Sequence, residues 1–219
     1  MKKITKEIKQ LNILTDNELN TIVDAANNNW ELFYNCNIQV FENNDLNHKI
    51  RLNNLKSIRK LQEKNKCYVS VAHNFSLCSK VEQELSQIKQ AINSSIKSYE
   101  LFSKSYKTNP LALNGSVFAY SNLANIYSNL GLDNIALDYL HEGQKLVNKS
   151  SNPYIPNIRI NMALANIYSK LNKFKRSTKL LEDIYVSANE KKYYQIVIPA
   201  LVNLANIYHN QEKYTKALT

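Results

Sequence analysis

The chain has 219 residues, of which 44% are hydrophobic and 21% are charged, with 3 Gly and 4 Pro. This length suffices for one large domain or one repeat array with a real core, and the shortage of turn-forming residues argues against an all-β protein. The formal net charge of +10 favours acidic partners, and the sequence contains no apolar run of about 18 residues that could span a membrane.

The charge and the cysteines also indicate which kind of partner and which cellular compartment to expect. Lysine-rich surfaces are common for solubility alone, so we do not expect nucleic-acid binding from charge. The three cysteines, Cys36, Cys67 and Cys78, form no disulfide framework and indicate reduced thiols in an intracellular protein. The basic start, residues 1–10, is not followed by the apolar region of a secretory signal, so we expect a cytoplasmic location.

The N-terminal half predicts a series of helices. A short amphipathic helix over residues 2–13 comes first, and Thr15 with Glu18 then forms a capping-box pattern. Apolar residues at three- and four-residue steps predict the helices that follow. These are one long helix over 16–42, a third over 46–64, a weaker fourth over 67–78, and a long one from Ser79 to about Lys107 that Pro110 ends.

The C-terminal half contains one hexapeptide three times. It reads NLANIY over 122–127, ALANIY over 163–168 and NLANIY over 203–208. The central leucines, Leu123, Leu164 and Leu204, are 41 and 40 residues apart (164 − 123 and 204 − 164). A fixed period of this size predicts stacked structural repeats, here a helix, a short turn and a second helix.

The repeat resembles the tetratricopeptide repeat, a helix–turn–helix unit. The first copy matches the family's large and small positions on the first helix, its turn glycine and its second helix: Tyr120, Leu123, Ala124, Tyr127, Gly131, Ala136, Leu140 and Gly143. The second copy departs from the pattern at Asn172 and Ile184, and the third keeps Tyr214 and Ala217 before the sequence stops at Thr219. The period of 40–41 residues exceeds the commonest tetratricopeptide period of about 34 residues. In this it is similar to the longer repeats of kinesin-light-chain-type arrays and of bacterial peptide-pheromone (RRNPP) regulators.

The resemblance implies an all-α fold, a right-handed α-solenoid of helix–turn–helix repeats with a degenerate helical N-terminal region. Residues 1–66 form an unassigned helical region, 67–110 a degenerate repeat, and 111–219 three repeats of which the last is incomplete. In the degenerate repeat, Ser95, Tyr99 and Phe102 take second-helix positions.

The last repeat lacks the polar cap that a solenoid needs. Three explanations stay open: a shortened chain, a gene fragment, or an end that a partner or a second copy of the chain covers, which would make a homo-oligomer.

In the resembled family, the first helix of each unit lines a concave face whose polar residues hold a peptide. Asn125, Asn166 and Asn206 share one position in the three copies, and an amide can pair with peptide backbone whatever its sequence. Asn122 and Asn203 stand three residues earlier. The alternative is that these asparagines merely reflect an Asn-rich chain, contacts to a neighbouring helix, or recent duplication.

Three charged residues are further candidates on the same helices. Lys170 and His209 stand late on their first helices and Arg159 stands earlier, and each could meet an acidic side chain or a terminal carboxylate of a peptide. The plainer interpretation for each is a solvated surface residue.

The sequence indicates no catalysis, no cofactor and no metal. Cys67, His73 and Cys78 are close in sequence, but their spacing fits no zinc motif and lacks a fourth ligand. With 3 glycines the chain has no phosphate-binding loop.

Two functional hypotheses follow. The first is a non-catalytic scaffold that binds a peptide or protein on the concave face. The alternative is a peptide-responsive cytoplasmic regulator whose N-terminal region contacts DNA or an effector protein. A compact N-terminal unit presenting a basic helix would favour the regulator, and an N-terminal region that continues the helical stack would favour the scaffold.

Overall fold

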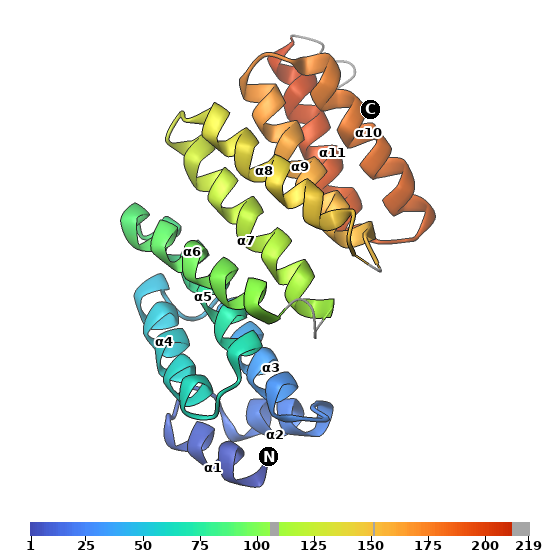
Figure 1. The fold of residues 1–219 in the computed structure, drawn as a ribbon. Helices are drawn as coiled ribbons and strands as arrows, with labels where there is room; N and C mark the ends of the chain where they lie inside the picture. Colours follow the sequence, from blue (N-terminus) through green and yellow to red (C-terminus); the bar gives the residue numbers. More distant parts are fainter. Residues whose placement is uncertain (106–109, 151, 212–219) are drawn as a thin grey trace.

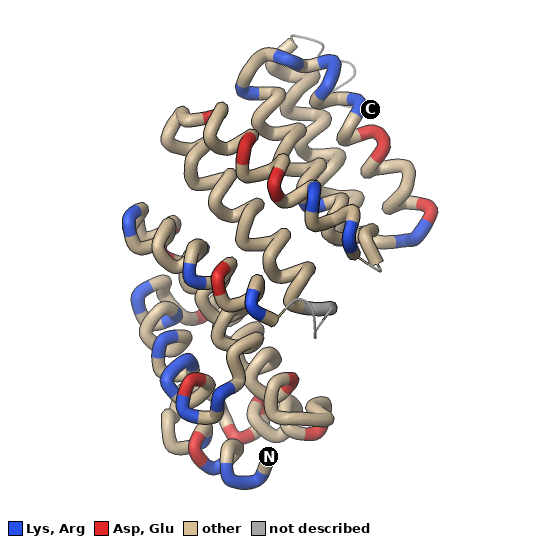
Figure 2. Tube along the Cα trace, viewed as in Figure 1, with Lys and Arg blue, Asp and Glu red and all other residues tan. Residues whose placement is uncertain are grey.

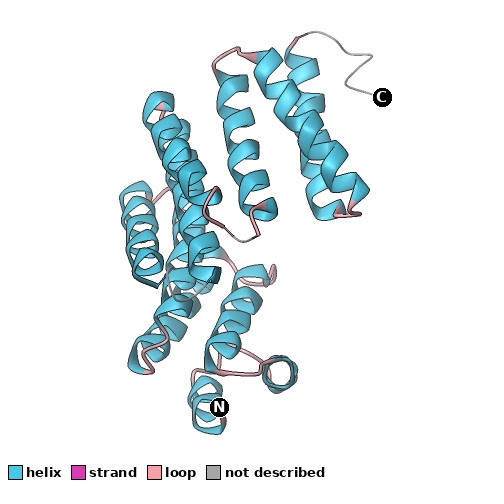
Figure 3. Ribbon diagram, turned by 45° about the vertical axis from the view of Figure 1, so that its right-hand side comes forward, coloured by secondary structure: helices cyan, strands magenta, loops and turns pink. Residues whose placement is uncertain are grey.

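The described chain is entirely helical, which confirms the all-α prediction. The computed structural model describes residues 1–105, 110–150 and 152–211, and among them it has eleven helices and no strand (Figures 1 and 3). The helices are α1 Lys2–Gln10, α2 Asp16–Ala25, α3 Asn29–Glu42, α4 His48–Lys64, α5 Tyr68–Glu84, α6 Ile88–Ser105, α7 Pro110–Asn129, α8 Asp133–Val147, α9 Tyr154–Lys170, α10 Phe174–Glu190 and α11 Tyr194–Asn210. None of these described helices is long and apolar enough to cross a membrane.

The helices start at a regular spacing that extends beyond the three hexapeptides. The starts of α4, α5 and α6 are 20 residues apart (48, 68, 88), and so are those of α9, α10 and α11 (154, 174, 194). Each short turn within these runs, and the α7–α8 turn, contains one residue with positive φ: Lys66, Ser86, Gly131, Asn172 and Lys192. The next N–H then bonds a carbonyl five residues back, as from Leu132 to Tyr127 at 2.9 Å, so one type of helix ending recurs along the chain.

The predicted helix over 16–42 is wrong, because the chain breaks between α2 and α3. Ala26 is extended (φ −98°, ψ 125°), and the Asn28 side chain accepts the backbone N–H groups of Trp30 and Glu31, each at 3.1 Å. Apolar Ala26 and Trp30 keep a four-residue step across this break, so periodicity alone did not reveal it. The Thr15–Glu18 capping box at the start of α2 is confirmed.

The predicted boundary at residue 79 is also wrong. Helix α5 continues through Ser79 to Glu84, and the long helix predicted over 79–107 is divided by a turn at 85–87. Ser86 takes the left-handed conformation at φ 58°, a role that glycine usually fills. Val81, Leu85 and Ile88 keep helical spacing across the turn, which concealed it. Residues 106–109, where the prediction ended this helix, lie outside the described chain, as do Tyr214 and Ala217.

The helices form two layers along an elongated molecule, with α1 at one end and α11 near the other (Figure 1). Neighbours in the chain pack on one another, and contacts also join each odd-numbered helix to the next odd-numbered one, from α3 through α5, α7 and α9 to α11. Even-numbered helices from α4 to α10 make at most weak contacts of this kind. The odd-numbered helices therefore form the more tightly packed layer.

The N-terminal helices share one core with α5. This core contains Ile8, Leu19, Phe33, Leu55 and Cys78 from five different helices. Three fully buried amides join α3, α4 and α5: Asn37 Oδ1 accepts from Gln62 Nε2 at 3.0 Å and from Asn74 Nδ2 at 2.8 Å. Residues 1–66 thus pack directly on the helix that follows them, α5.

Candidate functional site

The helices α7, α9 and α11 are poor in charge. Helices α7 and α11 contain no Lys, Arg, Asp or Glu, and α9 contains only Arg159 and Lys170. Helices α8 and α10 of the other layer carry both signs of charge (Figure 2). A face that keeps polar amides but few charges suits contact with uncharged backbone groups.

Two rows of residues run across this face, one residue from each helix. The first row contains Lys80, Asn125, Asn166 and Asn206, and its three asparagines are called the amide row here. Lys80, Asn125 and Asn166 each stand six residues before the positive-φ residue of the turn that follows. The second row stands seven residues earlier, two helical turns away on the same side: His73, Phe118, Arg159 and Pro199.

The three asparagines of the amide row are exposed, and two of them lie between buried neighbours. Asn125 lies between buried Ala124 and Ile126, and Asn166 lies between buried Ala165 and Ile167. Within the described chain, none of the three side-chain amides hydrogen-bonds to another residue. The position predicted from the sequence is therefore open to a ligand at each step.

The other predicted site residues have different surroundings. Asn122 is buried and donates from Nδ2 to the Ser76 carbonyl at 3.4 Å, so its amide joins α7 to α5. Lys170 donates from Nζ to the carbonyl and hydroxyl of Ser128, at 3.1 and 3.0 Å, and so holds the end of α7. Asn203 is half-buried and His209 is exposed on α11.

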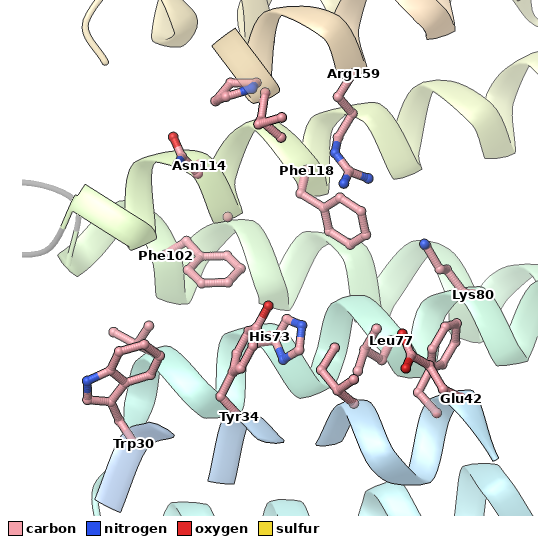
Figure 4. Close-up of a pocket in the computed structure, with 16 residues that line it drawn as sticks. Trp30, Tyr34, Glu42, His73, Leu77, Lys80, Phe102, Asn114, Phe118 and Arg159 are labelled. Carbon is pink, nitrogen blue, oxygen red and sulfur yellow. The ribbon is translucent and has the colours of Figure 1, made fainter. Parts of the chain in front are cut away.

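A cavity of about 550 Å³ opens beside the second row. It lies between α3, α5, α6, α7 and α9, and several aromatic side chains line it (Figure 4). The aromatic residues in the wall are Trp30, Tyr34, Phe41, Phe102 and Phe118. Its volume falls within the range of about 300–1,000 Å³ that is usual for ligand sites.

Gly115 of α7 shapes this cavity. A Cβ atom at this position would meet the Phe102 ring, so the glycine allows α6 and α7 to approach closely there. Phe102 is almost fully buried and forms part of the cavity wall.

Two cations flank one aromatic ring at the edge of the cavity. Arg159 Cζ lies 4.1 Å from the centroid of the Phe118 ring, and Lys80 Nζ lies 4.7 Å from it (Figure 4). Both distances are within the range of cation–π attraction. Among the described residues, neither cation makes an ion pair or a hydrogen bond, although Glu42 also lines the cavity.

The surroundings of these cations disfavour their charged forms. Desolvation by burial, and secondly repulsion from Arg159, lower the pKa of Lys80. Desolvation likewise lowers the pKa of Arg159, even though its side chain is accessible to solvent from the open side of the groove. An anion placed between them would be attracted by both.

A second hollow of about 340 Å³ continues from the first along α7, α9 and α11. Lys80, Ile155 and Arg159 line both hollows, and Asn125 and Asn166 line the second. Asn125, Asn166 and the aromatic cavity are therefore parts of one groove, with the cations at the junction of the two hollows.

The cavity also encloses a histidine that sequence reasoning did not use for binding. The His73 ring stacks on Tyr34 with centroids 4.3 Å apart, and its Nδ1 is buried without a hydrogen-bond partner among the described residues. Burial and the nearby Lys80 lower the pKa of His73 to about 4, so it is neutral at pH 7.

The other two members of the Cys67, His73 and Cys78 set do not join this histidine in a site. The described residues contain no group of three potential metal ligands. Cys78 is buried with its pKa raised by desolvation to about 12, which makes it a poor nucleophile.

Sequence reasoning proposed the asparagines as site residues but did not single out Lys80, Phe118 or the cavity. Lys80 stands at the asparagine position of α5, a signal that becomes readable only once the turn at Ser86 is known. The cavity is formed by five helices that are distant in sequence, so no local pattern contains it. The chain matches no protein-family model and no curated protein.

Proposed function

We propose that the chain is a non-catalytic scaffold that binds a peptide or protein segment along the groove of its odd-numbered helices. The array would be a tetratricopeptide-like α-solenoid, with these helices on the inner face. The observation that carries the proposal is the row of exposed amides at Asn125, Asn166 and Asn206, which have no hydrogen-bond partner in the described chain and stand on helices almost free of charge.

The amide row suits a peptide backbone for a chemical reason. Each amide offers two donors and an acceptor, which match the alternating C=O and N–H groups of an extended chain. Such contacts bind the peptide backbone whatever its side chains are. The part of the groove between the two rows would then determine which peptide side chains are preferred.

The experiment compares three proteins in a pull-down of interacting proteins from cells. One is the unaltered chain, one has Asn125, Asn166 and Asn206 all changed to Ala, and one carries Asn53, Asn134 and Asn189 changed to Ala. The control asparagines are exposed on α4, α8 and α10, in the other layer.

We expect the first triple variant to lose the captured partner and the control triple to keep it. Each lost hydrogen bond to an uncharged group contributes about 0.5–1.5 kcal/mol, so three together should weaken binding at least about tenfold. Equal capture by all three proteins, with unchanged circular dichroism, would refute the role of the amide row.

A second candidate function rests on α4. This helix carries six Lys or Arg residues and one Glu (Figure 2), and it belongs to the layer of even-numbered helices. We propose as the alternative that α4 contacts DNA or an acidic effector protein, as a peptide-responsive regulator would. Binding of duplex DNA that weakens steeply with salt and disappears in a Lys49→Gln, Lys56→Gln and Lys60→Gln variant would support it, and no binding at low salt would exclude DNA.

A further inference from the structure

The aromatic cavity and the two cations at its edge occupy one end of the groove, and together they restrict what can bind there. The wall offers five aromatic side chains to an apolar group, and burial of such a group is favoured in proportion to its area. Lys80 and Arg159 converge on the Phe118 ring from two helices, α5 and α9 (Figure 4), and among the described residues neither is held in an ion pair.

The unpaired cations favour an anion at this place. Two like charges are held near one ring and partly removed from water, an arrangement that a ligand carboxylate would relieve. Hydrogen bonds in which both groups are charged are also about twice as strong as neutral ones.

The continuity of the two hollows points to a peptide as the occupant. Lys80 and Arg159 line both the aromatic cavity and the hollow that contains Asn125 and Asn166. A chain that lies along the asparagines therefore reaches the cations first and the cavity directly after them.

We propose that the groove selects a peptide segment in which a large apolar side chain, inserted into the aromatic cavity, is adjacent to an acidic residue held between Lys80 and Arg159. This proposal deepens the proposed function and rests on it. It also assigns a role to the N-terminal region, because α3 supplies Trp30, Tyr34 and Phe41 to the cavity wall.

Trp30 provides a direct readout. It is the one tryptophan of the chain and lines the cavity, so its fluorescence reports the occupancy of this site. The full chain is titrated with acetylated, amidated heptapeptides of alanine that carry Phe-Glu or Glu-Phe at their centre. Matched probes replace Glu with Gln, or Phe with Ala.

We expect one order of the Phe and Glu pair to bind at least tenfold more tightly than its Gln and its Ala counterparts. Lys80→Met and Arg159→Gln should each reduce the preference for Glu over Gln, and the double variant should abolish it. Lys60→Met, which removes an exposed charge on α4, should leave the preference unchanged.

Three results would overturn the proposal. They are equal affinity for the Glu and Gln probes, a preference that persists in the double variant, and binding of free 3-phenylpropionate as tight as that of the peptides. The Asn125, Asn166 and Asn206 triple variant separates this failure from that of the proposed function. It should bind both the Glu and the Gln probes more weakly while keeping the preference for Glu.

Discussion

At the scale of single residues, one residue type performs two opposite tasks. Asn37 and Asn74 are fully buried, and Asn37 Oδ1 accepts from both Asn74 and Gln62, whereas Asn125 and Asn166 are exposed between buried neighbours. The repeat period could identify the exposed set because the same position recurs. It could not identify the buried set, since those amides meet across three helices and carry no local pattern.

His73 gives a prediction at this scale. Its pKa in the folded chain is lowered to about 4 from the ordinary 6.5. Between these two pH values His73 is protonated in the unfolded chain and neutral in the folded chain. The contribution of His73 to stability is complete above pH 6.5 and is lost as the pH falls towards 4. The loss amounts to about 1.4 kcal/mol for each pH unit in this window.

The measurement is urea denaturation at pH 7 and pH 5 for the unaltered chain and for His73→Phe, which keeps a ring against Tyr34. The variant should lose less stability between the two pH values, while the same change at the exposed His141 controls for the removal of a histidine. Parallel losses in the unaltered chain and in His73→Phe would show that His73 is not held neutral.

At the scale of elements, the helices were predictable and two of their ends were not. Helical spacing predicted α4 and the C-terminal helices because apolar stripes are long and regular there. The breaks after Ala25 and Glu84 were missed because apolar residues keep their spacing across them and neither turn contains Gly or Pro. At Ser86 a non-glycine residue takes the left-handed conformation, which residue preference does not predict.

The recurring turn gives a prediction for this scale. Gly131 has φ 76°, and a Cβ atom there would meet nothing within 4 Å, so Gly131→Ala tests the backbone alone. We expect a loss of about 1–2 kcal/mol in the free energy of unfolding. Lys192, at φ 58°, should gain up to about 1 kcal/mol on change to Gly.

The neighbouring Lys191 is the matched control, since it has an ordinary helical conformation at φ −88°. There the change to Gly should bring no gain and a loss of about 0.5–1 kcal/mol. Thermal or urea unfolding measures all three variants. A stabilised Lys191→Gly together with a destabilised Lys192→Gly would contradict the backbone explanation.

At the scale of the whole molecule, regularity extends further than the repeated hexapeptide. The helix spacing of 20 residues begins at His48, so the region before the first hexapeptide follows the same plan. Helix α3 joins the row of odd-numbered helices and completes the cavity, an arrangement that follows from packing between distant segments and that no sequence window could contain.

We propose that the partner lies on the odd-numbered helices. The test places a photo-crosslinking amino acid, p-benzoylphenylalanine, at Gln195 on α11 in one variant and at Asp138 on α8 in a control variant. Both positions are exposed, and of the two only Gln195 lines the groove. After capture of the partner and irradiation, we expect a crosslinked product from Gln195 and none from Asp138. A crosslink from Asp138 alone, or equal crosslinks from both, would contradict it.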